Sequence, residues 1–169
     1  LNALNTQRET FKDDDTVRLH GIMTAWGVSA NSTPADVRYE GRVRGATQEA
    51  ITDANAKMDR CLRAGALALG AGVNILTLPG YMPMNHDERL KDIFRRNAVR
   101  LVGEEHFLMR PLGRTRGGST EMGDLSHIMP AIHPYTGGAR GMGHGVDYVV
   151  EDYGQAVVMP AKAMAMTVI

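Results

Sequence analysis

A short polar segment, residues 117–148, gathers side chains that could do chemistry. Its side chains that could bind a metal ion or exchange protons include His127, His133, His144, Glu121 and Asp124. The many glycines of the same segment allow positive φ angles and a close approach of the backbone to another group. Polar loops of this kind are where binding and catalytic residues are often found. The segment is therefore the first candidate for a functional site.

His144 lies between Gly143 and Gly145, which leaves both nitrogens of its imidazole ring accessible. A histidine presented in this way can ligate a metal ion or transfer a proton. A histidine in an ordinary surface loop gives the same pattern, and from spacing alone this is the more common explanation. The glycines at 141, 143 and 145 do not form the G-x-G-x-x-G pattern and no Walker lysine follows, which argues against a nucleotide site.

The other histidines have simpler explanations. His127 and His133 lie beside or within the apolar run 128–135, which we expect to form a buried strand. Both are therefore expected to be core histidines with satisfied hydrogen bonds rather than metal ligands. His86 and His106 are expected to face solvent.

A second, smaller polar group is formed by Asn31, which precedes Ser-Thr-Pro, and Arg44, which ends the next predicted strand. An amide and a guanidinium together suit a carboxylate or a carbonyl oxygen. A turn asparagine and a solvated arginine would give the same residues, and taken alone that explanation is preferred.

The elements that must position these residues can be read from the periodicity of the apolar residues. Residues 16–24 and 36–44 alternate as half-buried strands do. Residues 47–69 have the three-and-four spacing of a helix face, with Thr47 as N-cap. A short run rich in branched residues, 73–78, predicts a further strand. Residues 1–79 thus resemble most of a split βαβ unit, a ferredoxin-like arrangement that lacks its first strand.

The sequence of the second half of the chain predicts two longer helices and one strand. Residues 85–103 show a helix face, and a capping box begins at Asn85. Residues 128–135 are expected to form the buried strand named above. A second capping box at Asp152 starts the last helix, in which Pro160 is expected to cause a kink or a restart.

The composition excludes several classes of partner. The 169 residues include 43% hydrophobic residues, enough for a packed core, and 19 basic and 19 acidic residues give no net charge. This balance argues against nucleic acid, another polyphosphate or a membrane surface as a partner. No apolar run is long enough to span a membrane. The lone Cys61 suits a reducing compartment, which predicts a cytoplasmic protein.

Both ends of the sequence interrupt a pattern. The chain begins at Leu1 within a helical pattern, and it stops at Ile169 inside an apolar helical run without a capping residue. We therefore expect a portion of a longer protein, with a trimmed but complete domain as the alternative.

Residues 119–130 resemble the S-[TE]-D-x-G-D-[VL]-S-x-x-x-P motif of the aminoacylase/carboxypeptidase metallopeptidase family. The closest group is that of the amidohydrolases of N-acyl amino acids and p-aminobenzoyl-glutamate. Residues 17–44 are similar to the lid-domain stretch of that family, in which N-x-x-P is followed by a strand ending in arginine. His144 falls where the family has its last metal ligand. Glu121 replaces the usual aspartate, and Gly145 replaces the usual serine or threonine.

The resemblance implies an α/β protein with an α+β lid. Residues 1–79 would be a partial, ferredoxin-like lid and dimerisation domain. Residues 80–169 would be the C-terminal part of a zinc-peptidase-like, metal-binding α/β domain. In this family the other metal ligands and the catalytic glutamate precede the lid, so the portion at hand would contain no catalytic residue.

The activity implied is metal-dependent hydrolysis of an amide bond in an N-acyl or aminobenzoyl amino acid or a small peptide. One or two zinc or manganese ions would act, with His144 as a ligand, while Asn31 and Arg44 would hold the substrate's carboxylate or the oxyanion. The resemblance also implies a small-molecule substrate and a homodimer formed through the lid. The chain alone would be inactive. The alternative is a non-catalytic dimerisation or interaction module derived from the lid.

Overall fold

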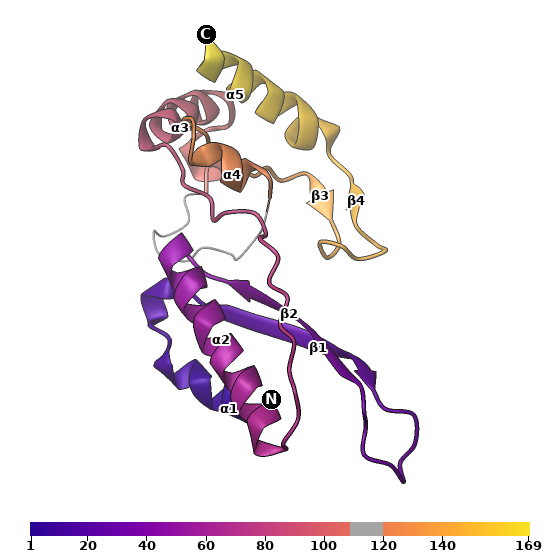
Figure 1. The fold of residues 1–169 in the computed structure, drawn as a ribbon. Coiled ribbons are helices and arrows are strands. Elements are labelled where there is room, and N and C mark those ends of the chain that lie inside the picture. The colour runs from indigo at the N-terminus through magenta and orange to yellow at the C-terminus, as the bar shows by residue number, and fades with distance from the viewer. Residues whose placement is uncertain (109–119) are drawn as a thin grey trace. The chain divides into compact units, whose positions relative to one another are not determined.

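In a computed structural model of the chain, residues 1–108 and 120–169 are described (Figure 1). They divide into two compact units, one formed by residues 1–83 and the other by residues 84–108 and 120–169. Each unit combines helices with one small antiparallel sheet, so the protein is of mixed helix and strand class. Residues 117–119 of the polar segment lie outside the described ranges. No helix in the described part of the chain has the length and apolar character needed to cross a membrane.

The sheet of the first unit is a hairpin of β1 (Arg18–Trp26) and β2 (Val37–Arg44). The first residue of β1 lies opposite the last residue of β2, and the register shifts between Met23 and Ala25. Side chains alternate between the two faces because a strand has a period of two residues. Leu19 is accordingly buried at 2% exposure, and the alternation predicted for β1 is confirmed. In β2 the alternation is less regular, because Val37 is 50% exposed and Val43 and Arg44 are both half-buried.

The long helix of the first unit, α2 (Gln48–Ala68), begins where the sequence predicts. The Thr47 hydroxyl accepts a hydrogen bond from the backbone N–H of Ala50 at 3.1 Å, which satisfies one of the open donors of the first turn. Met58 of α2 forms the core with Leu19 and with Leu4 of the short helix α1, and all three are at most 8% exposed. The remaining elements of this region are α1 (Asn2–Gln7) and the 3-10 turns η1 (Arg8–Thr10) and η2 (Asp13–Asp15).

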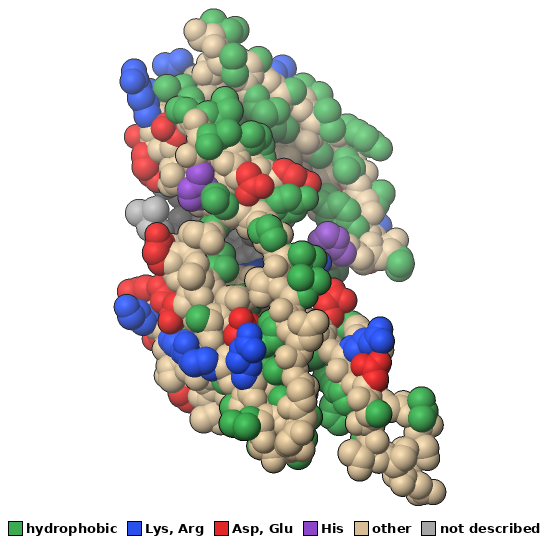
Figure 2. Space-filling view, viewed as in Figure 1, with side chains coloured by type: hydrophobic (Ala, Val, Ile, Leu, Met, Phe, Trp, Pro, Cys, Tyr) green, Lys and Arg blue, Asp and Glu red, His purple; other side chains and the backbone are tan. Residues whose placement is uncertain are grey.

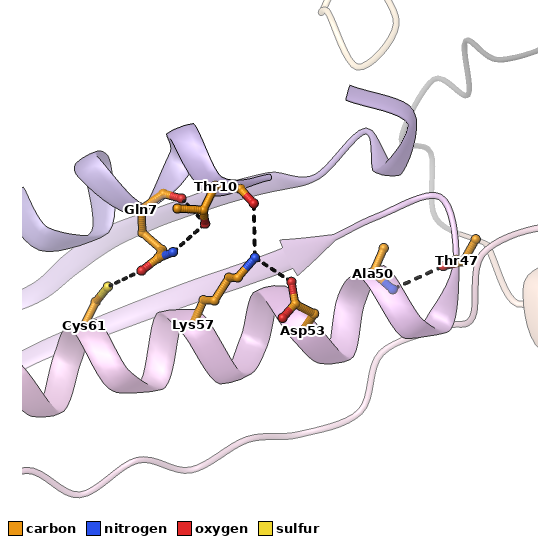
Figure 3. Close-up of polar contacts among 7 residues, drawn as sticks. All are labelled: Gln7, Thr10, Thr47, Ala50, Asp53, Lys57 and Cys61. Carbon is orange, nitrogen blue, oxygen red and sulfur yellow. Dashed lines mark hydrogen bonds and ion pairs between the residues drawn. The ribbon is translucent and has the colours of Figure 1, made fainter. Parts of the chain in front are cut away.

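Polar contacts join the N-terminal region to α2 (Figure 3). The Lys57 ammonium donates to the backbone oxygen of Thr10 at 3.2 Å and pairs with Asp53 one turn earlier at 2.7 Å. The Cys61 thiol lies 4.0 Å from the side-chain oxygen of Gln7. These contacts hold the first helix against α2, whose other face remains open to solvent.

The strand predicted at residues 73–78 is absent, because the structure has no strand or helix between residue 71 and residue 87. Branched residues favour an extended backbone, but a strand also needs a neighbour that accepts and donates its backbone hydrogen bonds. No such neighbour faces this run in the described part of the chain, and Leu76 and Leu78 are 80% and 74% exposed. The described part of the first unit therefore lacks the third strand on which the ferredoxin-like expectation depended.

The second unit is built on two helices that pack together, α3 (Glu88–Val102) and α5 (Met159–Val168). The Asn97 amide of α3, only 9% exposed, donates to the backbone oxygen of Met166 in α5 at 2.9 Å. Hydrophobic side chains remain uncovered along α5 (Figure 2). The other elements are η3 (Glu104–His106), α4 (Met122–Ser126), β3 (Ala139–Arg140), β4 (Val149–Val150) and the π-helical segment η4 (Gly154–Val158).

The ends of these helices differ in part from the predicted ones. The N-cap of α3 is Asp87, whose carboxylate accepts the N–H of Leu90 at 2.8 Å, so the capping box predicted at Asn85 is wrong by two residues. Gly103 ends α3 at a φ of 87°, as predicted. Asp152 caps the last helical segment as predicted, because its carboxylate accepts the N–H of Gln155 at 2.9 Å.

The strand predicted at residues 128–135 is also wrong. The only backbone hydrogen bond that this run makes to another segment of the described chain joins the N–H of Asp87 to the oxygen of Ala131, at 3.0 Å. A single bond does not make a ladder. Ala131 is buried at 7% exposure, whereas Ile128 is 81% exposed, so this apolar run is anchored at one point and not covered as a strand would be.

Candidate functional site

Asn31 lies in the loop that joins β1 to β2, and its side chain is exposed. The loop begins at Gly27, whose φ of 98° strongly favours glycine. The backbone N–H of Asn31 donates to the Ser29 hydroxyl at 3.2 Å. The loop therefore presents the Asn31 amide outward at the closed end of the hairpin.

Arg44 is the last residue of β2, at the open end of the same hairpin, and it is half-buried. A strand rises about 3.4 Å per residue, so β2 separates Arg44 from the loop of Asn31 by roughly 24 Å. The structure therefore does not bring Asn31 and Arg44 together within one hairpin, although the sequence suggests them as a pair. Spacing along the sequence does not reveal this, because it does not say which end of a hairpin a residue occupies.

His144 lies in the loop of the second hairpin, between β3 and β4, and its side chain is exposed. Backbone bonds close this loop, from the N–H of Gly145 to the oxygen of Met142 at 2.7 Å and from the N–H of Tyr148 to the oxygen of Gly145 at 3.2 Å. The pairing continues at the base of the hairpin, where the backbone oxygen of Gly138 accepts the N–H of Glu151, the residue after β4, at 2.9 Å. The imidazole is therefore held on a short, closed loop.

The backbone of His144 adopts a φ of 69°, one of only two positive φ values among the described residues other than glycine. A left-handed conformation is unfavourable for a residue with a Cβ atom, and such strain is concentrated at functional sites. The sequence does not predict it, because glycines on both sides of His144 could have made the turn alone.

Gly145 occupies the position where the resembled motif has serine or threonine. A Cβ atom at Gly145 would lie 2.5 Å from a carboxylate oxygen of Asp147 and 2.9 Å from the backbone oxygen of Met142. The second contact is with backbone, which cannot move aside as easily as a flexible side chain. This departure from the motif therefore fits the loop, which has no room for a larger residue.

The residues around His144 do not by themselves form a metal site. No group of three or more histidine, cysteine, aspartate or glutamate side chains lies close enough together to hold a metal ion in the described ranges. A catalytic zinc ion normally has three protein ligands, so one imidazole is not sufficient. No chemical step that involves a metal ion is therefore assigned to this chain alone.

Residues 122–126 of the motif form α4, and a turn follows. Ser126 is buried at 6% exposure, and its hydroxyl donates to the oxygen of Gly123 at 2.5 Å and accepts the N–H of Asn85 at 3.0 Å. It thus ties the end of α4 to the segment before α3, a role that the sequence alone does not reveal. Glu121 and Asp124 lie on the exposed side of the same turn.

An open cavity of about 290 Å³ lies between the start of α3 and the end of α4. It is lined by Asn85, His86, Asp87, Glu88, Ser126, His127, Met129 and Pro130. Partial burial lowers the pKa of His86, and nearby Lys91 and His133 act in the same direction against Glu88. The imidazoles of His86 and His127 thus lie together at this cavity.

The two histidines expected in the core are not there. His127 ends α4 with an exposed side chain. His133 is half-buried and meets the ring of Tyr135 edge-on, with ring centroids 5.2 Å apart. Neither histidine is in a core because the strand expected at residues 128–135, which would have buried them, does not form. His86 and His106 are exposed, as predicted.

Comparison with known proteins finds similar proteins that are named as dipeptidases. It is 29% identical over 174 residues to the Xaa-Arg dipeptidase of Mus musculus and 29% identical over 176 residues to that of Homo sapiens. The alignments cover 97% and 98% of this chain, which spans 39% of the length of each relative. No model of a protein family matches the sequence. The similarity to these dipeptidases supports kinship of the chain with the peptidases.

Proposed function

We propose that this chain is a portion of a metal-dependent amidohydrolase that cleaves the amide bond of an N-acyl amino acid or a small peptide. The observation that carries the proposal is the similarity to enzymes named Xaa-Arg dipeptidase, which extends over nearly the whole chain. Because the chain spans 39% of those relatives, residues outside it would supply the rest of the site.

In this proposal His144 is one ligand of a zinc or manganese ion. Its exposure on a closed loop and its strained backbone support the role, since both present the imidazole outward in one orientation. The remaining ligands and the general base would come from outside the described residues. When bound, the ion would polarise the amide carbonyl and activate a water molecule.

Asn31 and Arg44 are proposed to contact the substrate. A dipeptide spans at most about 7 Å, far less than the roughly 24 Å that separate the two ends of the hairpin. Both residues can therefore serve a substrate of this size only if they act in separate sites. A homodimer, in which residues 1–79 act as lid and dimerisation domain, would provide two such sites.

A non-catalytic dimerisation module is the second candidate function. The uncovered run with exposed Leu76 and Leu78 favours it, because an open apolar segment of this kind is suited to contact with another chain. This candidate does not explain why a strained histidine is held on a closed loop of the second unit.

The function is tested by comparing this chain with the complete polypeptide from its reading frame. We expect no turnover of N-acyl amino acids or Xaa-Arg dipeptides by the 169-residue chain with Zn²⁺ or Mn²⁺, because one histidine cannot hold a catalytic ion. The complete polypeptide should hydrolyse at least one of these substrates, and a chelator should abolish the activity. An inactive complete polypeptide, or metal-dependent turnover by the chain alone, contradicts the proposal.

Arg44→Ala in the complete polypeptide is expected to raise KM about ten- to a hundredfold with little change in kcat. A guanidinium that holds a substrate carboxylate acts equally in the ground state and the transition state, and such contacts contribute roughly 1.5–3 kcal/mol. Steady-state kinetics measure both constants. Arg63→Ala, which changes an exposed arginine of α2, serves as the control and should leave both unchanged. A loss of kcat at unchanged KM would instead assign Arg44 to the oxyanion.

A further inference from the structure

The hairpin that carries His144 is too short to hold itself in place. Its strands β3 and β4 have two residues each, and Ala139 and Arg140 of β3 are both exposed. A two-stranded hairpin of this size is at most marginally stable in water. Contacts at its base, outside the two strands, must therefore fix the direction in which the loop of His144 points.

The backbone at the base of the hairpin lies directly against the start of η4. The oxygen of Gly138, which precedes β3, accepts the N–H groups of Glu151 and Asp152 at 2.9 and 3.0 Å. Gly138 has a φ of 89°, and a Cβ atom there would lie 2.6 Å from the backbone oxygen of Asp152 and 2.7 Å from the backbone nitrogen of Ala156. Glycine is the residue that permits both this φ and so close an approach.

Within η4, the backbone oxygen of Gln155 receives no hydrogen bond from its own helix. In an α-helix the N–H of Met159 would donate to it. In this π-helical turn the N–H of Met159 donates to the oxygen of Gly154 instead. The next residue, Pro160, has no N–H to offer. The oxygen of Gln155 is therefore open to a donor from outside the helix.

The side chain of Thr136 supplies that donor. Its hydroxyl donates to the backbone oxygen of Gln155 at 2.7 Å. Thr136 and Gly138 both precede β3, so their bonds hold the base of the hairpin to η4 at two successive points. The bond of Thr136 also depends on the π-helical turn, because an α-helical turn would fill the same oxygen with the N–H of Met159.

We propose that Thr136 is a positioning residue for His144. Its hydroxyl, bound to the π-helical turn, sets the direction in which the short hairpin presents the imidazole. The inference rests on the proposed function in one respect, since a fixed direction of His144 matters for a ligand of a metal ion. The positioning itself is a property of this chain without metal, and it is measured first in that state.

Thr136→Val in the 169-residue chain removes the hydroxyl and nearly keeps the shape of the side chain. The NMR order parameter of the His144 N–H should fall from about 0.85, the value of a rigid backbone, to below about 0.6. The Tm should fall by no more than about 4 °C, because one exposed hydrogen bond is lost. Thr136→Ser keeps the hydroxyl and should restore the order. Thr77→Val, at an exposed threonine of the first unit, is the control and should change neither value.

A double variant separates positioning of the hairpin from simple satisfaction of the Gln155 oxygen. Thr136→Val/Pro160→Ala introduces an N–H at position 160 that can reach this oxygen from within the helix. The Tm should then recover, whereas the order parameter of His144 should stay low because the bond to the hairpin is still missing. Recovery of both would overturn the proposal and leave Thr136 a local hydrogen-bond donor. If Thr136→Val alone does not fold, this double variant carries the same test.

The complete polypeptide provides the second readout. Its metal affinity should fall by about tenfold with Thr136→Val, the lower end of the range for groups that support a ligand, and Thr136→Ser should restore it. An unchanged order parameter of His144 in Thr136→Val overturns the positioning. So does an unchanged metal affinity in Thr136→Val when His144→Ala loses the ion. Retention of the ion by His144→Ala contradicts the proposed function instead, and the order measurement on the metal-free chain still decides the role of Thr136.

Discussion

His144→Ala in the complete polypeptide is expected to remove most of the bound metal and to lower kcat by at least about a hundredfold. Loss of the groups that only support a metal ligand typically reduces affinity or activity 10- to 100-fold, so loss of a ligand itself should have a larger effect. KM should report the loss of metal poorly, because the substitution removes a ligand of the ion and no contact with the substrate.

The measurement is the metal content of the dialysed protein together with kcat for the best substrate. His106→Ala is the control, because His106 is an exposed histidine at the end of η3 and outside the loop of His144. The control should retain metal and rate. A His144→Ala protein that also retains both would make His144 a surface histidine, in agreement with the more common explanation of its sequence pattern.

Leu19→Ala is expected to lower the free energy of unfolding of the first unit by about 2–5 kcal/mol. Leu19 is 2% exposed and packs in the core with Leu4 and Met58, so the substitution removes buried methyl groups and leaves a cavity. Urea unfolding followed by circular dichroism measures the change. Fluorescence of Trp26, the sole tryptophan of the sequence, reports on the same strand.

Ile22→Ala is the matched control for Leu19→Ala. Ile22 lies three residues further along β1, on the outer face, and is 65% exposed. Its replacement should change stability by no more than about 0.5 kcal/mol. If both substitutions destabilise the unit equally, β1 does not direct Leu19 into the core and Ile22 away from it.

The elements predicted correctly from the sequence are those whose signals are local. The hairpin strands are set by alternation and the start of α2 by its Thr47 cap, and both can be read within a few residues. The strands expected at 73–78 and 128–135 failed because their existence depends on a distant partner. Apolar composition alone predicted that both runs are buried. The high exposure of Leu76 and Ile128 shows that no partner strand covers them in the described part of the chain.

The candidate site could be predicted as a set of residues but not as an arrangement. The residue type and glycine neighbours of His144 were sufficient to mark its loop, whereas its positive φ follows from the closure of that loop by backbone bonds. Asn31 and Arg44 are 13 positions apart, and the extended strand β2 between them places them at opposite ends of the hairpin. The role of Ser126 depends on contacts 41 residues apart, which no local pattern reveals.

The π-helical turn Gly154–Val158 before Pro160 has a consequence for how the chain is aligned with its relatives. A π turn holds one more residue than an α turn, so it corresponds to a one-residue insertion in an otherwise regular helix. A single gap therefore belongs within Gly154–Val158 where a relative has an uninterrupted α-helix. Deleting one residue there would preserve the phase of α5, whereas deleting one between Pro160 and Ala163 would rotate the buried Ala163 by about 100° out of the core.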